Sequence, residues 1–209
     1  VLIRSVVWPE YLLAARAPIY ELLVNSEFRQ EMTEYLKTLK PGYPKSYEEI
    51  VRLANEPSTN YRSPEKAFGL KYSQAHSLPI DDPSYLVLKN QMLPTFKAGI
   101  AAVFKKYNID ALFFPTNSRP AGLIKEEPKP ITGAEGGASP GNLTNESGYP
   151  EIVIPAGMTG GGLPVTMSFL GMAWSDAKLI GYGYDFEQAT KAIRLPKFTP
   201  SLPTDKIDY

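Results

Sequence analysis

The stretch EIVIPAGMTGGGLPVTMSFLG, Glu151 to Gly171, decides the fold of this chain. It contains two apolar runs, at 151–157 and 165–171, which have the length of buried strands and lie on either side of a glycine-rich turn. A third run of this kind, DALFFPT, stands at 110–116. The segments ALFF and IVI are apolar on both faces, and this pattern is typical of a parallel sheet that is covered on each side.

Helical patterns precede these strands. Residues 10–24 are apolar at helical spacing, and we expect Pro18 to kink or split this helix. The next helical pattern begins at a capping serine, Ser26, and ends at Pro41-Gly42. Its predicted inward face consists of Phe28, Met32, Tyr35, Leu36 and Leu39.

Two longer helices complete the pattern. Asp82-Pro83 opens the first of them, which we expect to bend at Pro94 and to end at a left-handed cap on Asn108. After the strands, SDAKLIGYGYDFEQATKAIR predicts a helix that is capped by Ser175 or Asp176.

This order of helices and strands gives an α/β fold class. Three short strands make a poor sheet, because both of its edges are left unprotected. We therefore expect the missing neighbours on another part of the polypeptide, so that this chain forms part of a larger α/β enzyme.

Composition excludes several classes of function. The chain has 209 residues, with Lys+Arg and Asp+Glu equal at 22 each, so it has no basic field for nucleic acid and reads as one soluble globular domain. It has no cysteine and one histidine, which excludes disulfides and Cys-ligated zinc and makes a histidine metal site improbable. We predict no metal and no cofactor.

No run is long and apolar enough for a membrane span, and the first residues lack the pattern of a signal peptide. Two glycosylation sequons, at Asn142 and Asn145, matter only in a secreted protein. These observations leave the compartment open, with the cytoplasm favoured.

A serine motif of hydrolases occurs at 137–141, Gly-Ala-Ser-Pro-Gly, which matches the G-x-S-x-G nucleophile elbow. The elbow needs a backbone N–H after its serine, and Pro140 has none. The histidine of such enzymes follows the serine, whereas His76 precedes Ser139. We interpret Ser139 as an exposed residue of a Pro/Gly loop, without a lysine or histidine within hydrogen-bonding reach.

A second serine motif, Ser63-Pro64-Glu65-Lys66, matches the S-x-x-K of penicillin-recognising enzymes, but the accompanying S-D-N and K-T-G elements are absent. A capping Ser63 followed by proline at the first helical position explains the same residues. Ser46-Tyr47-Glu48-Glu49 likewise predicts a capping box, ahead of a short helix that ends at Pro57. We interpret His76 as a helix-end or surface residue.

The stretch from Asn145 to Pro196 resembles the C-terminal hallmark of the amidase signature family. Asn-x-x-Gly-x-Pro precedes a buried strand and is followed by Pro-x-Gly, Gly-Leu-Pro, a strand ending in glycine, and a helix ending in Glu-x-Ala-Thr, here with Gln188 before the alanine. Upstream, FRQEMTEYLKTL, SYEEIVRLAN, LPIDDPSYLVLKNQM and DALFFPTNSRPAGL stand in the order of the second half of such enzymes. Thr166 replaces a usual glycine, and Met172 an arginine found in many members.

The resemblance implies the C-terminal portion of the amidase-signature α/β/α sandwich, with a mixed sheet that is incomplete in this chain. Residues 1–209 then form a single portion of that domain. Within it, 1–108 are mainly helical, 109–196 hold the strands and the hallmark C-terminal helix, and 197–209 form an extended tail.

The chemistry that the resemblance implies is hydrolysis of amides by a serine nucleophile, a bridging serine held through a cis peptide, and a lysine base. A desolvated lysine can accept a proton without a histidine. The family carries these residues in its first half, around a Gly-Gly-Ser-Ser-Gly-Gly stretch that this chain lacks. We therefore predict no catalytic residue here and no activity of the chain alone. The implied partners are the N-terminal catalytic portion of the same enzyme and a small-molecule amide substrate.

The predicted role of the chain is to complete the sheet and shape the substrate pocket. Thr116 and Asn117 follow the ALFFP strand, where ligands of open α/β sheets bind, and Asn145 precedes the IVI strand. We expect these three residues at one edge of the sheet around an open hollow. Tyr149 and Trp174 are candidates for an apolar wall. The alternatives are turn roles for the polar residues and core roles for the aromatic ones.

Two function classes stay open at this point. The first is the C-terminal part of an amidase-family hydrolase, and the second is a non-catalytic binding or scaffold module with an amidase-derived fold. An enzyme that uses Ser63 and Lys66, or Ser139, is a disfavoured third possibility.

Overall fold

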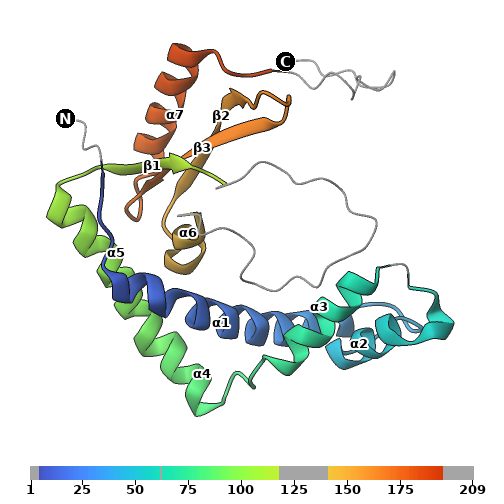
Figure 1. The fold of residues 1–209 in the computed structure, drawn as a ribbon. Coiled ribbons are helices and arrows are strands. Elements are labelled where there is room, and N and C mark those ends of the chain that lie inside the picture. Colours follow the sequence, from blue (N-terminus) through green and yellow to red (C-terminus); the bar gives the residue numbers. More distant parts are fainter. Residues whose placement is uncertain (1–4, 62, 118–140, 195–209) are drawn as a thin grey trace.

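The computed structural model of the chain describes residues 5–61, 63–117 and 141–194 (Figure 1). Helices α1 to α5 form one region, and three strands with helix α7 form another, with the short helix α6 below the sheet in Figure 1. The α/β class predicted from the sequence is confirmed. The predicted tail at 197–209 and the loop around Ser139 lie outside the described residues.

Helix α1 (Glu10–Lys37) is one continuous helix of 28 residues. The prediction that it splits at position 18 is wrong, and so is the prediction that Ser26 caps a second helix. Ser26 lies inside α1 and is 1% exposed. Its Oγ donates to the backbone oxygen of Leu22 at 2.6 Å and accepts from the backbone N–H of Leu78 at 2.9 Å. This back-bonding within a helix satisfies a serine that has no cap to form.

The predicted inward face of that segment is only partly buried. Leu36 is 4% exposed, whereas Phe28 and Tyr35 are 40% and 60% exposed. Helical spacing selects a face, but the packing partners of α1 cover only part of it.

The next three elements are α2 (Tyr47–Asn55), a 3-10 turn at Pro57–Thr59 and α3 (Pro64–Ala75). The predicted cap of α2 is confirmed, because Ser46 Oγ accepts from the backbone N–H of Glu49 at 3.1 Å. The reciprocal bond of the capping box is shifted by one residue, since Glu49 Oε2 accepts from the backbone N–H of Lys45 at 2.9 Å.

The stretch that opens at Asp82 divides into α4 (Pro83–Val87), a π-helical turn at Leu88–Met92 and α5 (Leu93–Tyr107). Asp82 accepts from the backbone N–H of Ser84 at 2.7 Å, as a cap does. The π turn ends at Met92, two residues before Pro94. A proline lacks an N–H and crowds the preceding turn, and a wider π turn accommodates both defects. Asn108 has the predicted left-handed conformation, with φ 49° and ψ 53°.

The three predicted strands are confirmed as β1 (Ala111–Pro115), β2 (Glu151–Met158) and β3 (Pro164–Gly171). Their order is β1-β3-β2, and both pairs are antiparallel, so the parallel pairing suggested by their apolar pattern is wrong. The connection between β2 and β3 is too short for a parallel crossover. Thr159 N–H bonds the backbone oxygen of Leu163 at 2.8 Å across this tight hairpin.

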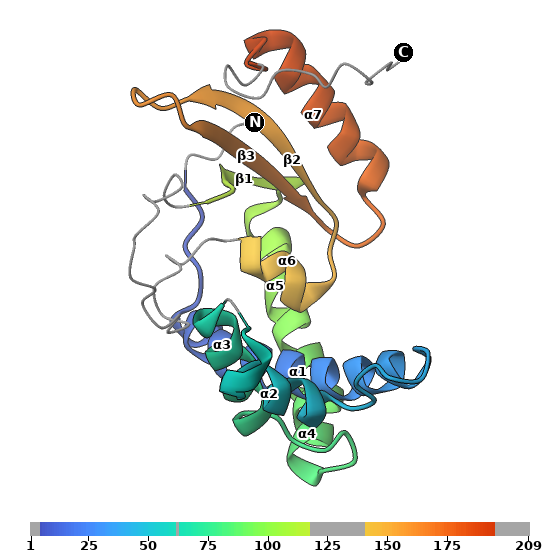
Figure 2. The same cartoon turned by 90° about the vertical axis from the view of Figure 1, so that its right-hand side faces the viewer.

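Helices cover both faces of the sheet (Figure 2). Helices α5 and α6 (Gly141–Ser147) lie on one face, and α7 (Asp176–Thr190) lies on the other, as predicted for a helix after the strands. The core between the sheet and α5/α6 consists of Phe96, Ile100, Phe104, Leu112, Phe114, Leu143 and Leu170.

Helix α7 packs closely on the sheet at Gly183. A Cβ at this position would lie 2.8 Å from Cδ1 of Ile152 and 3.3 Å from Cγ2 of Ile154, so the glycine lets helix and strand approach. Among the described helices, none has an apolar stretch that would cross a bilayer.

Candidate functional site

Thr116 directly follows β1 and extends its pairing with β3. The backbone N–H of Thr116 donates to the backbone oxygen of Thr166 at 3.1 Å. The hydroxyl oxygens of Thr116 and Ser168 lie 2.8 Å apart, and Ser168 is completely buried. A hydroxyl that bonds a buried hydroxyl holds the end of the strand in place. Asn117, the next residue, is exposed.

The strand register separates these two residues from Asn145 along the strand direction. Strands β1 and β2 run in the same direction because each pairs antiparallel with β3. Thr116 follows the carboxyl end of β1, whereas Asn145 lies in α6, ahead of the amino end of β2. These three residues therefore do not share one edge of the sheet as predicted. Thr116 and Asn117 lie at one end of the strands, and Asn145 lies toward the other end. Strand β3 lies between β1 and β2, so these two strands are next-nearest neighbours in the sheet.

A glycine turn joins α6 to β2. Gly148 has φ 68°, a left-handed conformation that favours glycine, and its N–H donates to the backbone oxygen of Thr144 at 2.8 Å. The Gly-x-Pro part of the sequence motif is thus the stop of this helix. Asn145 is exposed on α6, while Ser147 is buried.

Tyr149 belongs to the packing of the core. Its ring packs against the cluster between the sheet and α5, and its hydroxyl donates to the backbone oxygen of Lys97 at 3.3 Å. Its N–H donates to Ser147 Oγ at 3.1 Å. Through both contacts, Tyr149 holds the segment before β2 against α5.

Trp174 has the opposite environment, since it is 96% exposed. It lies in the turn between β3 and α7 and has φ 65°, which is uncommon for a residue with a side chain. Ser175 fixes this turn, because its N–H and its hydroxyl both donate to the backbone oxygen of Met172, at 3.1 and 2.7 Å. Strained residues of this kind are found at functional sites more often than elsewhere.

The other candidate serine, Ser63, acts as a helix cap. Ser63 Oγ accepts from the backbone N–H of Lys66 at 3.3 Å, which confirms the predicted cap of α3. Lys66 is exposed. His76 ends α3, as predicted, and its ring stacks on Tyr72 with 3.9 Å between centroids. Ser139 lies outside the described residues.

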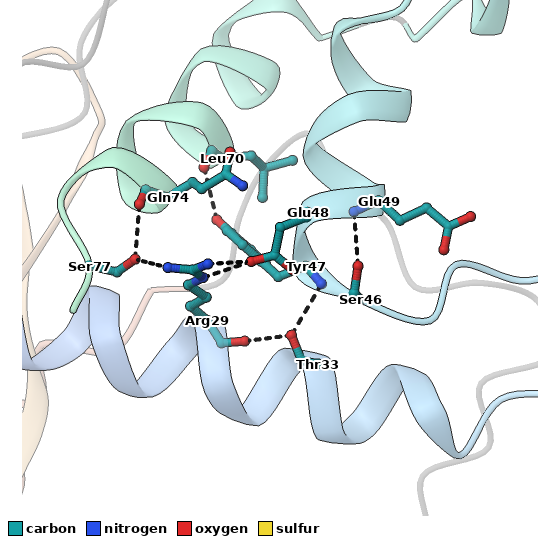
Figure 3. Close-up of polar contacts among 9 residues, drawn as sticks. All are labelled: Arg29, Thr33, Ser46, Tyr47, Glu48, Glu49, Leu70, Gln74 and Ser77. Atoms are coloured by element: carbon teal, nitrogen blue, oxygen red, sulfur yellow. Dashed lines mark hydrogen bonds and ion pairs between the residues drawn. The ribbon is translucent and has the colours of Figure 1, made fainter. Parts of the chain in front are cut away.

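Sequence reasoning missed a polar network among α1, α2 and α3 (Figure 3). Arg29 Nε donates to Glu48 Oε1 at 2.8 Å, and its NH2 group lies 2.6 Å from the same oxygen. Thr33 accepts from the backbone N–H of Tyr47 at 3.1 Å and donates to the backbone oxygen of Arg29 at 2.9 Å. Tyr47, fully buried, donates to the backbone oxygen of Leu70 at 3.0 Å.

The electrostatic consequences of this network are modest. The pKa of Glu48 is lowered, first by a hydrogen bond from its own backbone N–H and then by Arg29, against the opposing effect of burial. The pKa of Tyr47 is raised because burial disfavours the phenolate. These shifts stabilise charge states that the residues already have at neutral pH, so the network holds helices together and performs no proton transfer.

No cluster of three or more His, Cys, Asp or Glu that would hold a metal ion occurs among residues 5–61, 63–117 and 141–194.

The sequence model described as Amidase matches residues 5–180. A probable amidase of Arabidopsis thaliana is 49% identical over 51 residues, which are 24% of this chain and 10% of that protein. Indoleacetamide hydrolase of Agrobacterium vitis is 27% identical over 141 residues, 61% of this chain and 28% of that protein. The solved peptide amidase of Stenotrophomonas maltophilia matches with a TM-score of 0.70 and 27% identity, over 90% of this chain and 36% of the amidase.

The chain belongs to the amidase family. It spans only about a tenth to a quarter of the two curated relatives and about a third of the solved peptide amidase. The fold and motifs described above are therefore those of a part of an amidase.

Proposed function

We propose that the chain is the C-terminal part of an amidase-family hydrolase that acts on carbon–nitrogen amide bonds. It supplies sheet and substrate-pocket elements and lacks the two serines and the lysine of catalysis. The observation that carries this proposal is that 90% of this chain matches only 36% of a solved peptide amidase. The N-terminal catalytic portion of the same enzyme is the partner, and a small amide is the substrate.

The names of the relatives support an amide substrate. Two of them are a peptide amidase and an indoleacetamide hydrolase, whose names both specify a carboxamide. The chemistry common to them is attack on an amide carbonyl, for which oriented hydrogen-bond donors stabilise the developing negative charge.

The proposed pocket residues of this chain are Thr116 and Asn117 at one end of the sheet, and Asn145 and Trp174 toward its other end. Thr116 and Asn117 emerge from β1 with hydrogen-bonding side chains, and the pairing of Thr116 with β3 fixes their position. Trp174 offers a large apolar surface held by a rigid turn. Tyr149 contributes indirectly, by bracing the start of β2 against α5.

The test is an assay of amide hydrolysis with two proteins, the 209-residue chain and the same chain extended by the sequence that precedes it in its gene. We expect hydrolysis of small carboxamides by the longer protein and none by the 209-residue chain. Hydrolysis by the 209-residue chain alone would overturn the assignment of catalysis to the missing portion.

The alternative function, a non-catalytic binding or scaffold module, predicts a different pair of results. In that case the longer protein also fails to hydrolyse amides, and the 209-residue chain unfolds in one cooperative transition at low concentration. Aggregation or a molten state of the chain alone, together with activity of the longer protein, supports the amidase fragment.

A further inference from the structure

The face of the sheet that packs on α5 and α6 is covered unevenly. Two rows of cross-strand neighbours run across it from β1 through β3 to β2. In one row Phe114 is 8% exposed, Ser168 is 0% exposed and Val153 is 51% exposed. Helices α5 and α6 thus cover β1 and β3 on this face, and the cover stops at the edge strand β2.

The second row ends in a carboxylate. Leu112 pairs with Leu170, which pairs with Glu151, the first residue of β2. Leu170 is completely buried. Glu151 and Val153 are two positions apart in β2, so both side chains point to this same face.

The carboxylate of Glu151 is only half satisfied. Its Oε2 accepts a hydrogen bond from the hydroxyl of Thr144 on α6. Its Oε1 is buried and has no hydrogen-bond partner among the described residues. None of the ion pairs within the described part of the chain includes Glu151. A buried carboxylate oxygen without a donor is strongly unfavourable, and such an atom in a native protein normally has a partner.

We propose that an arginine or lysine side chain from the part of the amidase outside this chain docks on this face of β2. Glu151 as a whole is partly exposed, so Oε1 can turn outward to accept a hydrogen bond from the charged group, while the aliphatic stem lies along Val153. Residues two apart on a strand are about 6.8 Å from one another, which the stem of either side chain spans. This contact rests on the proposed function, since it names the partner surface of the same fragment.

A cationic side chain fits better than a neutral donor for two reasons. A hydrogen bond between an ionised donor and a carboxylate is stronger than one from a neutral N–H. One long basic side chain also covers Val153 and satisfies Glu151 together. A backbone N–H of a strand added beside β2 points along the plane of the sheet, away from a carboxylate on its face. The length of the relatives provides the source, because about two thirds of the solved peptide amidase has no counterpart in this chain.

The first test is a crystal structure of the longer protein, extended by the sequence that precedes this chain in its gene. We expect a nitrogen of an arginine or lysine within about 3 Å of Glu151 Oε1. A water molecule, a backbone N–H or a neutral side chain at that position would overturn the inference.

The second test is thermal unfolding of Glu151→Gln in both proteins. In the longer protein we expect Tm to fall by about 1–3 °C, because the substitution removes the charge of the pair. In the 209-residue chain we expect no fall, because Oε1 has no hydrogen-bond partner to lose. The matched control is Glu31→Gln, which changes an exposed carboxylate of α1 and is expected to leave Tm unchanged in both proteins. Equal falls for Glu151→Gln in both proteins would contradict the inference.

Val153→Ala provides an independent check of the same face. We expect a lower Tm only in the longer protein, and equal effects in both proteins would contradict the docking. Where the 209-residue chain gives no unfolding transition, the crystal structure decides.

Amide hydrolysis, measured separately, distinguishes the two proposals. An active longer protein without the contact refutes only this inference. An inactive longer protein with the contact refutes only the proposed function.

Discussion

The helical region of α1 to α5 and the strand region of β1 to α7 differ in how they satisfy their buried polar groups. In the helical region, Tyr47 and Ser26 are buried and their hydroxyls have partners within the same region. In the strand region, Glu151 has a buried oxygen without a partner among the described residues. Exposed aromatic rings occur in both regions, so apolar exposure alone does not separate them.

This difference indicates which region of the chain depends on a further segment of the protein. A group of helices closes its hydrogen bonds internally, because each helix satisfies its own backbone. A sheet leaves a row of unpaired backbone groups at each edge strand. With three strands, two of the three are edges, so the strand region is the part that an additional segment completes.

The largest effect is expected in the helical region, for Tyr47→Ala. This substitution removes a completely buried ring, its edge contact with Phe28 and its hydrogen bond to Leu70. We expect the free energy of unfolding to fall by about 3–5 kcal/mol in urea denaturation. Tyr43→Ala, at a ring that is 58% exposed, is the control and should change it by less than about 0.5 kcal/mol. Similar effects of the two substitutions would show that the region has no packed interior.

The contact between α7 and the sheet is probed by a matched pair of glycines. Gly183 meets Ile152 and Ile154, whereas nothing lies within 4 Å of a Cβ at Gly181. Gly183→Val should lower the free energy of unfolding by about 1–3 kcal/mol through overpacking. Gly181→Val, with the same change in helix propensity, should stay within about 0.5 kcal/mol of the parent chain. A harmless Gly183→Val would place α7 away from β2.

Ser63→Ala separates a cap from a catalytic serine. Loss of the bond to the N–H of Lys66 should lower the free energy of unfolding by about 1 kcal/mol. Lys66→Ala, which keeps the cap, should have little effect on stability. In the longer protein both variants should retain amide hydrolysis, and loss of activity with stability intact would restore the S-x-x-K interpretation.

The smallest effect is expected for Glu48→Gln. Because the pKa of Glu48 is lowered in the folded chain, its contribution to stability is present above the pKa of the unfolded state and is lost as pH falls. Both partners of the pair are at least one third exposed, so we expect a loss of only about 0.2–1 kcal/mol at pH 7. The difference from the parent chain should vanish between about pH 5 and pH 3. A difference that grows on acidification would contradict the ion pair with Arg29.

Local signals in the sequence were sufficient for the elements of the strand region. The apolar runs predicted three strands, and Ser175 or Asp176 correctly marked the start of α7. The pairing of the strands was not predicted correctly, because an apolar run does not specify direction. The glycine-rich connection at 159–163 was the available signal, since a turn this short forces an antiparallel pair.

In the helical region, by contrast, local signals in the sequence did not predict the contacts between helices. Ser26 matched a cap, yet it lies inside α1 and bonds Leu78, 52 positions away in the sequence. The pairs Arg29 with Glu48 and Thr33 with Tyr47 likewise join separate helices. No local pattern encodes such contacts, because they depend on how the helices pack.

The candidate site was predictable only by residue type. Thr116 was singled out by its place after a strand and Trp174 as an aromatic candidate for an apolar wall. The structure shows Thr116 bonded to Ser168 and Trp174 exposed. No local pattern indicated Glu151 as a half-satisfied acid, because burial of one of its oxygens depends on α6 and on the sheet register.

Amide hydrogen exchange is the measurement that tests the central claim most directly, namely that the strand region is completed by further polypeptide. It should be recorded for the 209-residue chain and for the longer protein. We predict that the longer protein slows exchange in β2 by at least about tenfold and leaves the buried turns of α1 around Leu23 and Ser26 nearly unchanged. Equal exchange of β2 in both proteins would contradict the account.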